Sequence, residues 1–143
     1  MIGTVGKFLI KLGLLAAKHP ILAAALAGAA GAAVSAMRNE DYREKLNKEN
    51  DKAIGIFDSG LGGLTVLHEL KKKMPQEKFI YFGDTAHIPF GNKSKRTIEK
   101  YCLDIIDFLE TQNIKLIIVA CNTASSVALK RIKTHTNIPI IDV

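Results

Sequence analysis

Three short segments carry polar side chains suited to chemistry, and each directly follows an apolar run: Asp58-Ser59, Asp84-Thr85 and Cys121-Asn122-Thr123. Cys121 has the widest range of reactions, because a thiolate serves as a nucleophile, a metal ligand or a base for proton transfer. Its place at the predicted start of a helix favours the thiolate, which backbone amides at a helix N-terminus stabilise. The alternative for any single cysteine is the role of a small buried apolar side chain.

The neighbours of Cys121 favour binding of a carboxylate. Asn122 and Thr123 offer side-chain and backbone donors beside the thiol, and Ser59 opens the glycine-rich loop Gly60–Gly63 that enters a helix. Such loops commonly bind anions, but this one matches neither of the glycine-rich nucleotide-binding patterns. Asp58 has two open roles: it orients the cysteine or binds a substrate ammonium group, or it caps the following loop or helix.

Two further reactive side chains are predicted to have structural roles. Asp84 is expected to cap a turn or helix, and the role of His87 stays open. Cys102 shares a helical spacing with Ile98, Ile105 and Leu109, which predicts a core position. The chain has no Cys-x-x-Cys pair and no local cluster of His and Cys, so we predict no metal site.

Alternating strand and helix signals must position these groups. Apolar runs predict strands at 54–57, 79–82, 116–119 and 138–141, separated by helical patterns over 64–73, 94–112 and 122–135. Near-continuous apolar strands between amphipathic helices predict an α/β fold, with an open, parallel four-stranded sheet flanked by helices. In such a sheet the segments that follow the strands meet at the carboxyl edge, where ligands bind.

Composition sets outer limits on function. The chain has 143 residues, a net charge of +6 and 48% hydrophobic residues, which suits a globular chain with one domain of ordinary size. The positive charge is spread thinly and lacks interleaved aromatic residues, so nucleic-acid binding is not predicted. Two cysteines cannot build a disulfide framework, and free thiols indicate a reducing, cytoplasmic setting.

The N-terminal third differs from the rest of the chain in composition. Residues 1–37 predict an apolar, lysine-containing helical extension, 38–52 a charged linker, and 53–143 the α/β domain. Three interpretations of 1–37 stay open: a membrane anchor, a signal peptide with small residues near Ala36, or a helix that packs on itself or a partner.

The motifs IGIFDSGLGGLTVL, YFGDTAHIPFG and IIVACNTASSVAL, within residues 54–143, resemble the N-terminal half of bacterial glutamate racemase. This resemblance implies the cofactor-independent aspartate/glutamate racemase family, and hence interconversion of L- and D-glutamate without pyridoxal phosphate. It also implies supply of D-glutamate to peptidoglycan and a homodimer. In this family one cysteine thiolate removes the Cα proton and a second cysteine, on the opposite face, returns one.

The resemblance carries over to individual positions. Cys121 matches the first catalytic cysteine, and Asp58 matches a residue that contacts substrate and assists it. The other matching substrate-binding positions are Ser59, Phe90, Gly91, Asn122 and Thr123. Phe90 stands where the family usually has tyrosine, so it lacks a hydroxyl that its relatives have.

The family's second cysteine comes from a second α/β domain with no counterpart up to Val143. Cys102 is no substitute, because it is predicted to lie mid-helix. We therefore expect that these residues alone do not racemise by the two-base route, whether they are a truncated product, a split enzyme or a fragment. The alternatives are a racemase for aspartate or another amino acid, and a non-catalytic, membrane-associated fragment.

Overall fold

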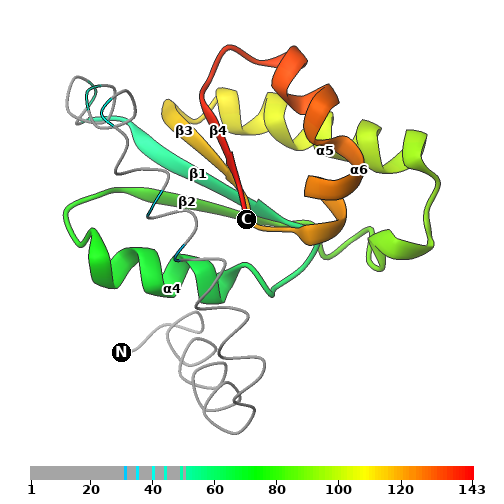
Figure 1. Cartoon of the computed structure of the whole chain (residues 1–143), viewed down its shortest axis with the longest axis horizontal. Helices are drawn as coiled ribbons and strands as arrows, with labels where there is room; N and C mark the ends of the chain where they lie inside the picture. Colours follow the sequence, from blue (N-terminus) through cyan, green and yellow to red (C-terminus); the bar gives the residue numbers. More distant parts are fainter. Residues whose placement is uncertain (1–30, 32–34, 36–39, 41–43, 45–48, 50) are drawn as a thin grey trace, which may run out of the picture.

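The computed structural model describes residues 31, 35, 40, 44, 49 and 51–143. The described elements follow in the order β1 (Ala53–Asp58), α4 (Leu64–Lys73), β2 (Phe79–Gly83), the 3-10 turn η1 (Phe90–Asn92), α5 (Lys95–Glu110), β3 (Ile114–Val119), α6 (Asn122–His135) and β4 (Ile140–Asp142). The strands form one parallel sheet in the order β2-β1-β3-β4 (Figure 1). This confirms the predicted α/β fold.

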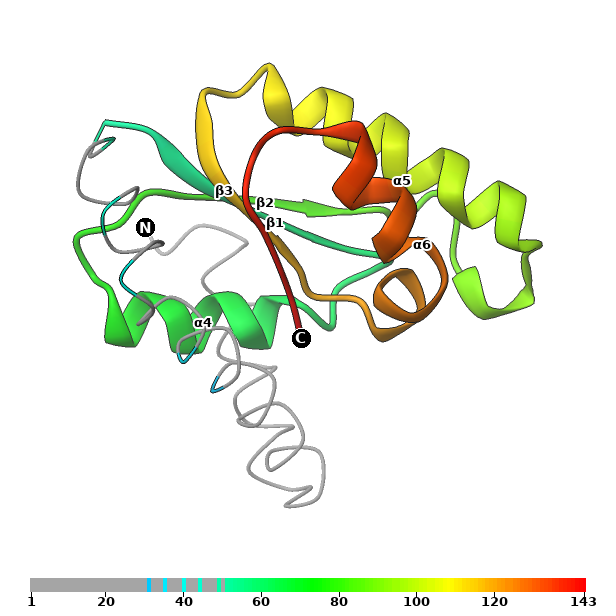
Figure 2. The ribbon, with the colours of Figure 1, turned by 45° about the horizontal axis from the view of Figure 1, so that its top comes forward.

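Helices cover both faces of this sheet. Helix α4 lies against one face, and α5 and α6 lie together against the other (Figure 1, Figure 2). Side chains alternate between the two layers along each strand. Ile56 and Ile118 pack on the α4 side, whereas Phe57 and Val119 pack on the side of α5 and α6. Every residue of β1 and β3 is buried, which explains why both are mostly apolar. Their charged exceptions are Asp58 at the end of β1 and Lys115 in β3, which pairs with Glu77 at 2.7 Å.

Local signals set the ends of the helices. Three lysines occupy the last turn of α4, where cations suit the helix dipole. Helix α5 begins after Ser94, whose hydroxyl accepts a hydrogen bond from the Thr97 amide. It ends two residues before the predicted limit. The turn that follows contains Asn113 at φ 53°, a left-handed conformation that asparagine tolerates.

The strands end together at one edge, as predicted. Backbone hydrogen bonds continue past them: the Ala120 amide donates to Phe57 O at 2.8 Å, and the Asp84 amide donates to Asp58 O at 3.0 Å. The segments that follow β1, β2 and β3 are therefore tied side by side.

The predicted extension over 1–37 and the linker over 38–52 fall almost wholly outside the described residues. Within the part of the chain that the structure describes, no helix has the length and apolar character needed to cross a membrane.

Candidate active site

Cys121 lies at the N-cap of α6, at the carboxyl edge of the sheet. Its extended backbone precedes the first turn, and its Sγ accepts a hydrogen bond from the Ala124 amide at 3.4 Å. The same sulfur lies 3.1 Å from Ser59 Oγ, across 62 residues of sequence. The residue is only 4% exposed. Cys121 is thus both largely shielded from water and in contact with the segment that follows β1.

Asp58 uses its two carboxylate oxygens differently. Oδ2 accepts a hydrogen bond from the Gly63 amide at 2.9 Å, and Gly63 is the N-cap of α4. Oδ1 accepts from the Ser59 hydroxyl at 3.4 Å. Asp58 is buried, so both contacts act away from bulk water. The two roles left open for Asp58 by the sequence, orienting the site and supporting the next helix, are therefore compatible.

Together these contacts form a continuous polar chain. The Cys121 thiol donates to Ser59 Oγ, and the Ser59 hydroxyl donates to Asp58 Oδ1. A proton moved along this chain would leave a thiolate beside the first amides of α6, where the helix dipole favours negative charge. The arrangement suits a thiolate that acts as a base.

Glycines allow the loop after β1 to lie close to the strands. A Cβ on Gly63 would lie 2.9 Å from the Asp58 Cβ and 3.0 Å from the Ala120 Cβ. A Cβ on Gly83 would lie 2.3 Å from Gly60 O. The loop therefore packs directly on the ends of β1 and β2, and side chains larger than hydrogen would push it away.

Tyr81 is a site neighbour that the sequence did not single out. Its hydroxyl donates to Gly60 O at 2.9 Å. Burial raises the pKa of this hydroxyl well above its ordinary value, and the nearby charges of Asp58 and Cys121 raise it further. A tyrosine within an otherwise apolar strand was the available signal, because its hydroxyl needs a partner when it is buried.

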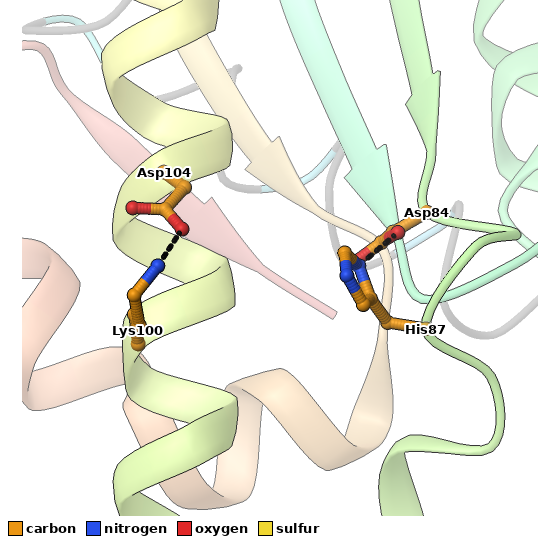
Figure 3. A network of polar contacts seen from close by, with 4 residues as sticks. All are labelled: Asp84, His87, Lys100 and Asp104. Atoms are coloured by element: carbon orange, nitrogen blue, oxygen red, sulfur yellow. Dashed lines mark hydrogen bonds and ion pairs between the residues drawn. The ribbon is translucent and has the colours of Figure 1, made fainter.

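Asp84 contacts a side chain of the turn that follows β2 rather than the start of a helix. Both of its carboxylate oxygens contact His87 Nδ1, at 2.8 and 2.9 Å (Figure 3), while the turn η1 begins after Pro89. The His87 ring also stacks on Tyr101, with ring centroids 3.9 Å apart. The buried carboxylate of Asp84 therefore has its hydrogen-bond partner, His87, within the turn itself. His87, whose role was open, anchors its loop on α5.

A small pocket of about 120 Å³ lies beside this pair, on the α5 side of the sheet. Its lining residues are Phe82, Asp84, His87, Tyr101, Asp104 and Ile105. Asp104 is paired with Lys100 at 2.7 Å (Figure 3). The pocket therefore marks the packing of the 84–93 loop against α5.

The other predicted substrate-binding residues differ in exposure. Phe90 is 2% exposed and belongs to the same buried cluster as Cys121. Gly91 and Asn122 are exposed, and Thr123 is half-buried. Phe90 thus contributes packing, whereas Asn122 and Thr123 stand at the open start of α6.

Cys102 occupies the core, as its helical spacing predicts. The side chain is fully buried on α5, and burial raises the pKa of the thiol to about 12, with smaller effects from the charges of Cys121, Asp84 and Glu99. It is therefore a protonated thiol at neutral pH. Among the described residues no group of three or more His, Cys, Asp or Glu side chains is placed to hold a metal ion.

Comparison with known proteins connects this geometry to a family. The chain is 56% identical over 92 residues to a glutamate racemase of Geobacter metallireducens. It superposes on the Francisella tularensis glutamate racemase in complex with D-glutamate with a TM-score of 0.63 and 46% identity. The Escherichia coli glutamate racemase, in complex with L-glutamate and the activator UDP-MurNAc-ala, superposes with a TM-score of 0.61 and 33% identity. No protein-family model matches the chain.

These matches cover about two thirds of this chain but a minority of each relative. The aligned region is 64% of this chain and 34% of the Geobacter protein. It is 65% of this chain against 36% of the Francisella structure, and 64% against 35% of the Escherichia structure. The chain spans about a third of the length of the curated relatives it matches. The resemblance to part of a glutamate racemase is therefore confirmed.

Proposed function

We propose that this chain is part of a glutamate racemase and that Cys121 is the base that removes the Cα proton of glutamate. The observation that carries the proposal is the 3.1 Å contact between Cys121 Sγ and Ser59 Oγ. It joins two of the racemase-like motifs at the N-terminus of α6, at the edge where parallel sheets bind ligands.

The contacts of the site suggest how the thiolate forms. The Sγ proton passes to Ser59 Oγ as the Ser59 hydroxyl proton passes to Asp58 Oδ1. The thiolate that results keeps the Ala124 amide as donor. It then takes the Cα proton, and the electron pair of the C–H bond moves toward the substrate carboxylate.

The negative charge that develops on the substrate carboxylate needs fixed donors. Asn122 and Thr123 begin α6 directly beside Cys121, and the first amides of a helix are oriented toward an anion. We propose these two residues, with Ser59, as the carboxylate site, and Phe90 and Gly91 as further substrate-binding residues. Preorganised donors of this kind commonly supply the largest share of catalysis in proton abstraction.

Glutamate is the proposed substrate because two of the relatives were solved with it, D-glutamate in one and L-glutamate in the other. Aspartate is the competing candidate. The two amino acids are distinguished by measuring exchange of each at equal concentration, and faster exchange of aspartate would overturn the glutamate assignment.

Exchange of the Cα proton in deuterated water tests the role of Cys121. We expect proton NMR to show loss of the Cα signal of glutamate with the parent chain and none with Cys121→Ala. The matched control is Cys102→Ala, which removes the other thiol and is expected to exchange at close to the parent rate. If Cys121→Ala exchanges as fast as the parent, Cys121 is not the base.

We also propose that the protein supplies D-glutamate to peptidoglycan in the cytoplasm and forms a homodimer. Family resemblance supports this role, as does the activator UDP-MurNAc-ala in the Escherichia coli relative. Light scattering measures the oligomeric state.

Attachment of residues 1–37 to membranes stays a prediction. A fluorescent fusion of that segment tests it, and a wholly soluble fusion would exclude it.

A further inference from the structure

We propose that Tyr81 is a positioning residue for Cys121: its hydroxyl fixes the Gly60 carbonyl and so holds Ser59 against the thiol. The inference rests on the proposed function for its catalytic consequence. Its structural part, the control of Cys121 by a residue on β2, is tested separately below.

Tyr81 connects β2 to the loop after β1. The hydroxyl donates to Gly60 O at 2.9 Å, across 21 residues of sequence. The ring packs against the buried cluster on the α4 side of the sheet. Its two Cε atoms lie 3.1 and 3.2 Å from where a Cβ would stand on Gly83 and Gly63. The ring therefore lies directly beneath the loop.

The Gly60 carbonyl is confined on a second side. A Cβ on Gly83 would lie 2.3 Å from this oxygen, so the backbone of β2 is in close contact with it. The Tyr81 hydroxyl thus holds the oxygen in place while the Gly83 backbone limits its movement. Ser59 directly precedes Gly60, so its position depends on where this carbonyl is fixed.

Ser59 has little tolerance for displacement. Its Oγ contacts Cys121 Sγ at 3.1 Å and Asp58 Oδ1 at 3.4 Å. The second contact is already long for a hydrogen bond between oxygens, and such bonds weaken steeply with further separation. A shift of the loop by about 1 Å would break the contact to the carboxylate. The polar chain from thiol to carboxylate therefore depends on the loop being held.

The Tyr81 hydroxyl remains a hydrogen-bond donor to Gly60 at the pH of the experiments. Burial raises the pKa of the Tyr81 hydroxyl, and the charges of Asp58 and Cys121 raise it further. Tyr81 therefore keeps its proton at neutral and moderately alkaline pH, and its hydrogen bond to Gly60 persists over that range. A phenylalanine would fill the same space without this bond.

The test compares Tyr81→Phe with Tyr101→Phe in the full chain. Both variants remove one tyrosine hydroxyl, but Tyr101 lies on α5, on the other face of the sheet. For Tyr81→Phe we expect kcat for Cα exchange to fall about tenfold with KM for glutamate within twofold, because one hydrogen bond is lost. Tyr101→Phe should stay within twofold of the parent in both constants. An unchanged kcat in Tyr81→Phe would overturn the proposal.

Alkylation by iodoacetamide separates this inference from the proposed function, because it needs no substrate. Peptide mapping by mass spectrometry measures the extent of alkylation of Cys121 and of Cys102 in the same sample. We expect Tyr81→Phe to slow alkylation of Cys121 about fivefold at pH 7.5 while Cys102 stays protected. A displaced Ser59 no longer relays the thiol proton to Asp58, which lowers the population of the reactive thiolate. Alkylation of Cys121 at the parent rate overturns the role of Tyr81, and so does loss of Cys102 protection, which would indicate general loosening of the core. If the parent shows no exchange, the proposed function fails and the alkylation result still decides the role of Tyr81.

Discussion

Asp58 contacts the start of α4 with one carboxylate oxygen, and in the proposed mechanism the other oxygen accepts a proton through Ser59. Asp58→Asn keeps an oxygen for the Gly63 amide but removes the group that accepts a proton through Ser59. We expect exchange of the glutamate Cα proton to fall at least about tenfold, with the free energy of unfolding within about 0.5 kcal/mol of the parent. Both are measured on one preparation, by NMR and by urea denaturation.

Asp58→Ala separates the two tasks further. It leaves the buried Gly63 amide without its acceptor, which costs about 1–3 kcal/mol. The control is Asp104→Asn at an exposed ion pair with Lys100, where a change below about 1 kcal/mol is expected. Parent-like exchange in Asp58→Asn would refute a role for the carboxylate in activating Cys121.

Cys102 makes the free energy of unfolding depend on pH in the alkaline range. Burial, helped by the nearby charges, raises the pKa of its thiol from the ordinary value of 9.0 to about 12. The unfolded chain therefore releases this proton at lower pH than the folded chain does. The stabilisation is complete below pH 9 and is lost as the pH rises from about 9 toward 12.

A comparison of the parent with Cys102→Ala isolates this contribution. Between pH 8 and 10.5 we expect the parent to lose about 2 kcal/mol more than the variant, from 1.36 kcal/mol for each unit above pH 9. Urea denaturation at several pH values measures both curves. Parallel curves would show that Cys102 is not held as a neutral thiol in the folded protein.

At the scale of elements, the glycines on either side of the active edge have opposite tolerance for a side chain. Gly83→Ala places a Cβ 2.3 Å from the Gly60 carbonyl, a backbone atom that cannot swing aside. Gly91→Ala meets nothing within 4 Å. We expect Gly83→Ala to lower the free energy of unfolding by about 1–3 kcal/mol, as overpacking does, and Gly91→Ala to change it by less than about 0.5 kcal/mol. Thermal denaturation followed by circular dichroism measures both, and equal stabilities would contradict the close packing of the loop on β2.

The contrast between these glycines also shows what the sequence could predict. The sequence pattern located β1 and β3 because both are buried on both faces and contain the apolar runs 54–57 and 116–119. It missed the start of β3, because the buried Lys115 interrupts the apolar pattern there. It placed Cys121 and Ser59 at one edge because parallel strands end together. The predicted strand over 138–141 starts only at Ile140, since Pro139 has no amide to donate to a neighbouring strand.

Contacts made by the loops at this edge were beyond sequence reasoning. The bond of Tyr81 to Gly60 depends on how the loop after β1 packs on β2, and that of Asp84 to His87 depends on how one loop folds back on itself. No periodicity reveals the first pair, and the three-residue spacing of the second does not by itself indicate a contact. The same holds for the close approach of Gly83 to Gly60, which only the register of β1 with β2 brings about.

At the scale of the whole molecule, the helices leave one edge of the sheet for a ligand. Helix α4 covers one face and α5 and α6 the other (Figure 2), and α4 and α6 both begin at the carboxyl edge beside Asp58 and Cys121. Of the two cysteines, Cys121 is at this edge and Cys102 is sealed in the core. A glutamate bound there meets one reactive sulfur, on one side of its Cα.

This asymmetry predicts the stereochemistry of exchange. A single thiolate removes and returns a proton on the same side, so we expect deuterium to enter one enantiomer of glutamate at least about tenfold faster than the other, without inversion. Proton NMR measures exchange and chiral chromatography measures inversion. Adding the part of the Geobacter metallireducens relative that this chain does not align with, purified separately, should bring inversion if that part carries the opposing base. Inversion by the 143 residues alone would require a second base among them, and would refute the single-thiol site that the burial of Cys102 implies.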